Sequence, residues 1–317
     1  MTASLQDKLD SDARAVLDLI EASGRPPLNQ LSVAQAREAV CASLAVLGKA
    51  PPPVREHDCD IAGPGGSVPV RIYRPLGEAG EAALPALLYM HGGGWMLGDF
   101  AYGAWFCASL AQLLGIAVVS VDFRLAPEHP YPAGLDDCMA VLRHLHGHAD
   151  TLAIEGGRIA IAGDSAGGNL AAVCALMARD EGISLKAQIL IYPVTDLLEE
   201  QESYARNAEG FGLTADVMRW FKSAYRNGAD AADWRVSPLR AERMDAVAPA
   251  LVLTCGFDPL YAEGNAYAER LARAGVPVLH IQYRDQIHGF LMWAEKVGAA
   301  EQALAQIAGE LRHRLFA

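Results

Sequence analysis

The chain has 317 residues, of which 52% are hydrophobic and 20% are charged, enough for one large domain or two small ones with a buried core. Its net charge of −12 disfavours binding to nucleic acid or to an anionic membrane surface. No uninterrupted apolar segment reaches the ~18 residues that a membrane span needs. Residues 1–20 lack the pattern of a secretory signal.

Two helices are predicted before any strand, over residues 7–23 and 32–48, where apolar side chains such as Ile20, Val40 and Leu44 recur at helical spacing. From about residue 54 strands and helices alternate. Strands are predicted at 68–75, 85–90, 116–124, 158–163, 187–193, 249–256 and 277–283, and helices at 103–114, 134–146, 167–180, 262–274 and 294–314. This order indicates an α/β fold with a mainly parallel central sheet and helices on both faces.

One long interval, residues 194–248, interrupts the alternation and contains a predicted amphipathic helix at about 213–226 with Thr214 as its N-cap. It follows the carboxyl end of a strand, where open parallel sheets bind ligands. We therefore expect a cap made of residues 1–50 and an insertion at 195–235. The catalytic core would comprise residues 51–194 and 236–317.

Ser165 lies in the segment GDSAGG (163–168), between a predicted strand and a predicted helix. G-x-S-x-G in that context matches the nucleophile-elbow motif, although an N-cap serine or a tight glycine turn gives a similar pattern. The segment HGGGW (91–95) also follows a strand, and glycine loops of this kind supply the oxyanion hole of lipases and esterases.

Two later residues complete the chemistry that a serine nucleophile requires. Asp258 and His288 each follow a predicted strand, so they would lie at the same edge of the sheet as Ser165. His288 would accept the serine proton, and Asp258 would orient the imidazole and stabilise its charged form. A nucleophile elbow is expected to be followed along the chain by the acid and then by the base, which is the order Ser165, Asp258, His288.

Five segments in the same order and spacing carry a resemblance to a known family: HGGGW (91–95), DFRLAPEHPYPA (122–133), GDSAGG (163–168), DPLYAEG (258–264) and HGF (288–290). The chain resembles the bacterial hormone-sensitive-lipase-type (family IV) carboxylesterases, which have the α/β-hydrolase fold with a helical cap, and the resemblance spans nearly the whole chain. It departs at Ala262, Asp285 and Gln286, which concern the rim and polarity of the pocket.

The resemblance implies that Ser165 is the nucleophile, Asp258 the acid and His288 the base. It also implies an oxyanion hole whose N–H donors come from Gly93, Gly94 and Ala166, with Gly92 shaping the loop. The expected reaction is hydrolysis of short- to medium-chain carboxylic esters through an acyl-enzyme, with a small-molecule ester as the partner and no cofactor. An amidase or arylformamidase could use the same triad. A non-catalytic receptor on this fold would lack the base, whereas His288 is present.

Other residues are weaker candidates. For the substrate pocket we expect six, each with core packing as the alternative: Trp95, Asp164, Tyr192, Phe211, Leu213 and Ile287. Asp122, Arg124, Glu128 and His129 are expected to pair within a bracing loop. Glu263 is expected to support the site or the start of a helix.

Metal and disulfide sites are not expected. His144, His146 and His148 alternate, but their segment is predicted to end a helix, so no metal is predicted there. The six cysteines form no CxxC pair, which favours free thiols in a cytoplasmic, reducing compartment. The oligomeric state is open, with a homodimer as one option.

Overall fold

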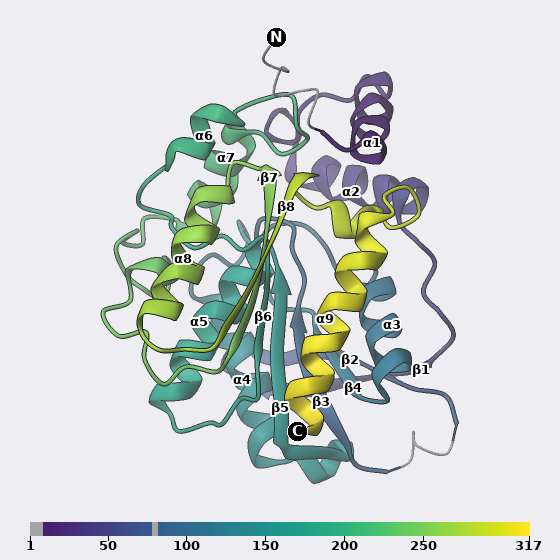
Figure 1. Cartoon of the computed structure of the whole chain (residues 1–317), viewed down its shortest axis with the longest axis vertical. Coiled ribbons are helices and arrows are strands. Elements are labelled where there is room, and N and C mark those ends of the chain that lie inside the picture. Colours follow the sequence, from purple (N-terminus) through teal and green to yellow (C-terminus); the bar gives the residue numbers. More distant parts are fainter. Residues whose placement is uncertain (1–8, 78–81) are drawn as a thin grey trace.

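An eight-stranded sheet organises the chain in the computed structural model, which describes residues 9–77 and 82–317 (Figure 1). The strands lie in the order β1-β2-β4-β3-β5-β6-β7-β8. Their bounds are β1 Arg55–Gly63, β2 Gly66–Arg74, β3 Leu84–Met90, β4 Ala117–Val121, β5 Ile154–Asp164, β6 Gln188–Ile191, β7 Ala250–Phe257 and β8 Val278–Ile287. The first residues of the helix predicted at 7–23, and residues 1–8 of the predicted cap, lie outside the described part of the chain.

The sheet is parallel except at one edge. β3 to β8 pair in parallel, whereas β2 is antiparallel to both β1 and β4. All seven residues of β3 are buried, as are all five of β4, which explains why these strands are continuous apolar runs in the sequence. The predicted α/β fold with a mainly parallel sheet is confirmed.

Helices cover both faces of the sheet. α3 (Ala104–Leu114) and α9 (Ala299–Phe316) pack together on one face. On the other face lie α4 (Ala133–Gly147), α5 (Ala166–Asp180) and α8 (Tyr261–Arg273) (Figure 1). Two clusters of buried apolar side chains, one on each face, form the core, since each helix buries its apolar stripe against the sheet.

Two further groups of helices lie beyond the carboxyl ends of the parallel strands (Figure 1). The first group is α1 (Ser11–Ala22), the 3₁₀ turn η2 (Leu28–Gln30) and α2 (Val33–Leu47). The second is α6 (Glu202–Arg206) and α7 (Ala215–Arg226). α7 contacts η2, so segments far apart in sequence meet above the sheet.

Local capping fixes where these helices begin. Ser32 and Gln35 form a reciprocal capping box at α2. Thr214 Oγ1 accepts the N–H of Val217 at 3.1 Å, so the predicted N-cap of α7 is confirmed.

Among the described residues, no helix is both long and apolar enough to cross a bilayer.

Three elements differ from the sequence predictions. β1 was not predicted, because its sequence is polar and most of its side chains are exposed at the sheet edge. The short helix α6 was not predicted either. The last helix begins at Ala299 rather than at 294, because residues 294–298 form a turn that follows the 3₁₀ turn η6 (Phe290–Trp293). Two other 3₁₀ turns lie elsewhere in the chain, η4 (Ala149–Leu152) and η5 (Pro238–Arg240).

Candidate active site

Ser165 stands on a sharp turn between β5 and α5. Its backbone has φ 55° and ψ −117°, a conformation that costs a non-glycine residue on the order of 1–3 kcal/mol. The Ser165 N–H donates to the carbonyl of Ile191 at 2.8 Å, which helps to hold the turn. A Cβ at Gly163 would lie 2.2 Å from the Gly167 oxygen, and one at Gly167 would lie 2.1 Å from the Met90 oxygen. The glycines are therefore required by close backbone approach.

The structure brings Asp258 and His288 to this serine. His288 Nε2 lies 2.9 Å from Ser165 Oγ, and His288 Nδ1 lies 2.7 Å from Asp258 Oδ2. Asp258 is fully buried, and its second oxygen accepts the N–H of Leu260 at 2.8 Å. Asn207 of the insertion donates to the carbonyl of Asp258 at 2.9 Å. The carboxylate, imidazole and hydroxyl thus form a continuous hydrogen-bonded chain.

The glycine loop lies beside Ser165 in the wall of the same cavity. Gly93 has φ 100° and Gly94 has φ 63°, which turn the backbone past the serine. Within the described part of the chain, their N–H groups donate to no acceptor. Ala166 is the first residue of α5, where N–H groups have no partner within the helix. These three groups can converge on a developing oxyanion.

Gly92 has a different role from its neighbours. Its N–H donates to Asp164 Oδ1 at 2.7 Å, so it is not free to bind an oxyanion and instead fixes the loop. Asp164 also accepts a hydrogen bond from the Tyr89 hydroxyl at 2.7 Å. Burial raises the pKa of Asp164 to about 6, although these two hydrogen bonds favour its charged form.

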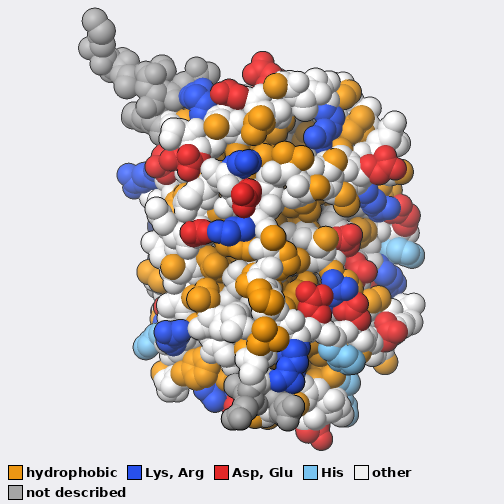
Figure 2. All heavy atoms as spheres, turned by 90° about the vertical axis from the view of Figure 1, so that its right-hand side faces the viewer, with side chains coloured by type: hydrophobic (Ala, Val, Ile, Leu, Met, Phe, Trp, Pro, Cys, Tyr) orange, Lys and Arg blue, Asp and Glu red, His pale blue; other side chains and the backbone are white. Residues whose placement is uncertain are grey.

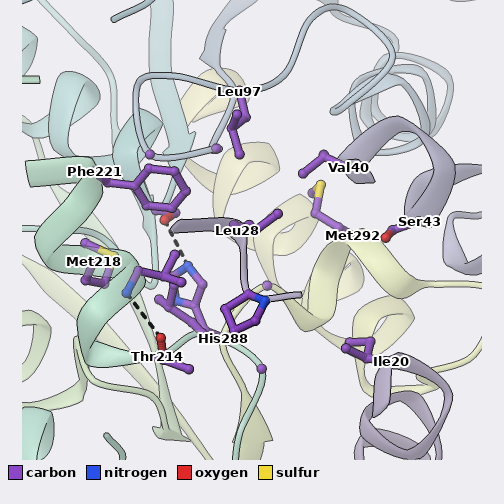
Figure 3. A pocket seen from close by; sticks show the side chains of 18 of the residues that line it. Ile20, Leu28, Val40, Ser43, Leu97, Thr214, Met218, Phe221, His288 and Met292 are labelled. Atoms are coloured by element: carbon purple, nitrogen blue, oxygen red, sulfur yellow. Dashed lines mark hydrogen bonds between the residues drawn. The ribbon is translucent and has the colours of Figure 1, made fainter. Parts of the chain in front are cut away.

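An apolar cavity of about 370 Å³ opens in front of the serine (Figure 3). Its wall contains Ser165 and His288 together with side chains from α1, η2, α2, α7 and η6. In Figure 3, Phe221 and Met218 lie at the catalytic end, whereas Ile20 and Ser43 lie at the far end. The cavity can accept an apolar chain attached to a carbonyl held at Ser165.

Of the six predicted pocket residues, only Leu213 lies in this wall. The other five lie outside it, because each is engaged in packing or hydrogen bonding behind the wall. Three of the five are aromatic rings packed on a neighbouring ring: the ring centres are 4.3 Å apart for Trp95 and Tyr225, 4.7 Å for Tyr192 and His288, and 4.9 Å for Phe211 and Phe257. Ile287 is fully buried. Asp164 accepts the hydrogen bond that holds the glycine loop.

Sequence reasoning missed most of the wall. The missed side chains share an origin on amphipathic helices and on the segments after β3 and β8: Ile20, Leu28, Val40, Leu44, Leu97, Tyr102, Val217, Met218, Phe221, Met292 and Trp293. Helical periodicity marked several of them as apolar positions, but it could not say that they face a cavity rather than the core.

The proline-rich loop after β4 is braced from outside, so the expectation that its charges pair within it is wrong. Arg124 donates from two nitrogens to Asp137 of α4, each at 2.8 Å. Glu128 pairs with Arg37 of α2 at 2.8 Å, and Arg37 also donates to the carbonyl of Met96 at 2.9 Å. Arg37 thus links the N-terminal helices to the glycine loop.

The alternate histidines lie away from this site. His144 and His146 are in the last turn of α4, and the rings of His144 and His148 are 5.3 Å apart. Among the described residues, no group of three or more His, Cys, Asp or Glu side chains could hold a metal ion.

The comparison with known families agrees with the fold. Residues 87–292 match the family described as the α/β hydrolase fold. This chain belongs to the α/β hydrolase fold family. The predicted resemblance is therefore confirmed at the level of the family.

Two relatives of this α/β hydrolase are similar to it over most of their length. Carboxylic ester hydrolase LipN of Mycobacterium tuberculosis is 40% identical over 267 residues, which are 81% of this chain and 70% of that protein. Ethyl acetate hydrolase of Pseudomonas putida is 36% identical over 317 residues, which are 97% of this chain and 99% of that protein.

Solved structures agree closely with this α/β hydrolase. An ester hydrolase from the metagenome of Lake Arreo, in complex with a derivative of bipyridine phosphonate, has a TM-score of 0.93 at 39% identity and covers 98% of this chain and 100% of its own. A thermostable esterase from Pseudomonas putida has a TM-score of 0.93 at 35% identity, covering 97% and 98%.

Proposed function

We propose that this α/β hydrolase is a serine carboxylesterase that cleaves short- to medium-chain carboxylic esters through an acyl-enzyme. The observation that carries the proposal is the hydrogen-bonded chain from Asp258 through His288 to Ser165 Oγ at the mouth of an apolar cavity. Relatives named as ester hydrolases support ester rather than amide substrates.

The geometry supports a two-step reaction. Ser165 Oγ attacks the ester carbonyl carbon while His288 Nε2, 2.9 Å away, accepts its proton. The carbonyl oxygen becomes negative and receives hydrogen bonds from the N–H groups of Gly93, Gly94 and Ala166. His288 then gives its proton to the departing alkoxide, which leaves as the alcohol. Water then attacks the acyl carbon and gives a proton to the same imidazole. The bond from the acyl carbon to Ser165 Oγ breaks, His288 returns the proton to Oγ, and the carboxylic acid is released.

Asp258 remains an anion in this scheme. Its Oδ2 lies 2.7 Å from His288 Nδ1, which fixes the imidazole tautomer that leaves Nε2 able to accept the proton. Burial of the carboxylate and its bond from the Leu260 N–H hold it in one orientation.

Replacing the nucleophile tests the proposal. We expect Ser165→Ala to lower kcat for a nitrophenyl butyrate by about 10³-fold or more while circular dichroism and Tm stay close to wild type. Turnover within tenfold of wild type by the correctly folded variant would contradict the assignment.

The cap is part of the same proposal. Residues 1–50 and 195–235 would cover the core formed by residues 51–194 and 236–317, since α1, α2 and α7 supply cavity wall. Gly212, Leu213 and Thr214 of the insertion line the cavity as well. This arrangement would make both segments determinants of substrate selection.

The proposed partner is a small-molecule ester and not nucleic acid. On the face seen in Figure 2, acidic and basic side chains are intermixed, without a broad basic patch of the kind that binds phosphate backbones. A cytoplasmic location is supported by the six cysteines, all of which are free thiols. A homodimer remains the option to test by sedimentation.

A further inference from the structure

A buried pair of opposite charges lies beside α7, outside the cavity wall and outside the catalytic triad. Lys222 of α7 is 7% exposed and Glu263 of α8 is fully buried. Lys222 Nζ lies 4.0 Å from Glu263 Oε2. Lysine and glutamate are almost never this buried unless they are paired. The reaction proposed above uses neither side chain.

Glu263 holds the first residues of the insertion against α8. Its Oε1 accepts the N–H groups of Thr195 at 2.7 Å and Asp196 at 3.2 Å, and Thr195 Oγ1 donates to the carbonyl of Glu263 at 2.9 Å. Its Oε2 accepts no hydrogen bond from any described residue and faces the lysine. Burial raises the pKa of Glu263 to about 7, whereas Lys222 acts in the opposite direction.

Lys222 ties α7 to the same place. Its Nζ donates to the carbonyl of Asp196 at 2.8 Å and lies 4.5 Å from the centre of the Tyr204 ring of α6. These contacts are directional, whereas the apolar packing of α7 is not, so the ammonium specifies one position of the helix. α7 is thereby joined to α6 and to the base of the insertion.

The position of α7 determines the shape of the cavity at its catalytic end. Val217, Met218 and Phe221 of this helix line the cavity. Figure 3 shows Met218 and Phe221 beside His288. The Phe221 ring packs directly on the glycine loop, because a Cβ at Gly94 would lie 2.3 Å from it. A small displacement of α7 would therefore change the room available beside the reacting carbonyl.

We propose that the buried Lys222–Glu263 pair positions α7 and thereby sets which ester side chains the cavity accepts. Both are positioning residues, and the inference rests on the proposed esterase function. Without the pair, α7 would keep its apolar packing but lose its fixed position. Contacts to the preferred substrate would weaken and longer chains would be excluded less strictly.

The test compares Lys222→Met with Arg219→Gln on the same helix. Methionine keeps a long side chain without the charge, whereas the ion pairs of Arg219 with Glu200 and Asp216 are exposed to solvent. For a nitrophenyl ester series from acetate to laurate, we expect the Lys222→Met variant to raise KM for the preferred ester about fivefold, with kcat within about twofold, and to flatten the chain-length profile. The Arg219→Gln variant should match wild type.

A double variant separates positioning from stability. At pH 8, above the pKa of Glu263, Lys222→Met alone leaves the Glu263 carboxylate buried without its cation and should lower Tm. Adding Glu263→Gln removes that charge and should restore Tm, yet KM should stay raised because the contacts of the ammonium to Asp196 and Tyr204 are still missing. If Lys222→Met does not fold, the double variant alone carries the comparison.

Three outcomes would overturn the inference. The first is a chain-length profile of the Lys222→Met variants that equals that of Arg219→Gln. The second is a double variant in which KM returns to the wild-type value together with Tm. The third is a Lys222→Met variant that loses kcat on every ester while KM is unchanged. Wild-type turnover is measured first, because failure of the wild type to hydrolyse any ester would reject the proposed function and not the positioning role.

Discussion

At the residue scale, Asp164 joins the nucleophile turn to the glycine loop. It directly precedes Ser165, is fully buried, and accepts hydrogen bonds from the Gly92 N–H and the Tyr89 hydroxyl. The two catalytic loops are therefore held to each other by one carboxylate, and the oxyanion donors depend on it for their position.

Replacing this carboxylate should impair the transition state more than substrate binding. We expect Asp164→Ala to lower kcat by about 10–100-fold with KM within about twofold. The reason is that loss of a single oxyanion-hole donor lowers kcat on the order of 10²-fold. Steady-state kinetics with a nitrophenyl ester measures this. Tyr89→Phe is the control, since it removes one donor to Asp164 and leaves the bond to Gly92, so its effect should be smaller. Equal kcat in Asp164→Ala and wild type would refute the role.

Sequence reasoning was most informative for residues with a fixed chemical role. Ser165, Asp258 and His288 were predicted from motif context and chain order, and the structure brings the three together. Asp164 and Tyr192 were expected in the pocket, but both lie behind the wall. Side-chain direction around a strained turn depends on the tertiary structure, so local pattern could not supply it.

At the element scale, the passage from β5 to α5 leaves no space for side chains on its glycines. A Cβ at Gly163 would lie 2.2 Å from the backbone oxygen of Gly167, which cannot move without shifting α5. By contrast, a Cβ at Gly157, earlier in the same strand, would meet no atom within 4 Å.

This contrast gives a matched pair of substitutions. We expect Gly163→Ala to abolish esterase activity or prevent folding, with a Tm loss of several degrees, because the backbone clash distorts the turn that holds Ser165. Gly157→Ala should keep wild-type activity and a Tm within a few degrees. Activity assays and thermal unfolding of both variants provide the check. An active, stable Gly163→Ala enzyme would show that the turn can accommodate a Cβ at this position, contrary to the expectation.

Elements with strong apolar periodicity were predicted well, and polar ones were not. β3 and β4 were recognised as continuous apolar runs. β1 was missed because its fold depends on pairing with β2 and on ion pairs such as Arg71–Asp58, at 2.7 Å, rather than on an apolar pattern. Long-range pairing of this kind leaves little signal in a single sequence.

At the scale of the whole molecule, buried acids couple stability to pH. Burial raises the pKa of Asp164 to about 6 and that of Glu263 to about 7, above their ordinary values of 3.8 and 4.5. The folded state therefore holds protons that the unfolded state releases. The stability that these two protonated acids contribute is complete at pH values below their pKa in the unfolded chain. It is lost as the pH rises through their higher pKa in the folded protein.

The variant Glu263→Gln isolates one of these contributions. The difference in Tm, variant minus wild type, should become more positive from pH 5 to pH 8, because only the wild type loses the Glu263 proton in that range, whereas Asp164 titrates in both proteins. Glu128→Gln is the control: Arg37 lowers the pKa of Glu128, so its Tm difference should stay constant over the same range. Parallel Tm curves for Glu263→Gln and wild type would contradict the assigned pKa. Burial also lowers the pKa of His91, but this residue is present in the wild type and in both variants, so its titration does not change the Tm differences.

The fold and the family could be predicted at this scale because the order of strands, helices and motifs constrains them jointly. The wall of the cavity could not, because α1, α2 and α7 are separate in sequence and meet only in the folded chain. The apolar faces of these helices were visible, whereas the space between them was not.

Acylation of Ser165 is the central claim, and intact-protein and peptide mass spectrometry after brief reaction with a nitrophenyl phosphonate tests it most directly. We predict one covalent adduct per chain, confined to the peptide that contains Ser165, absent from Ser165→Ala and strongly slowed in His288→Ala. An adduct on another residue, or one that forms equally in Ser165→Ala, would contradict the account.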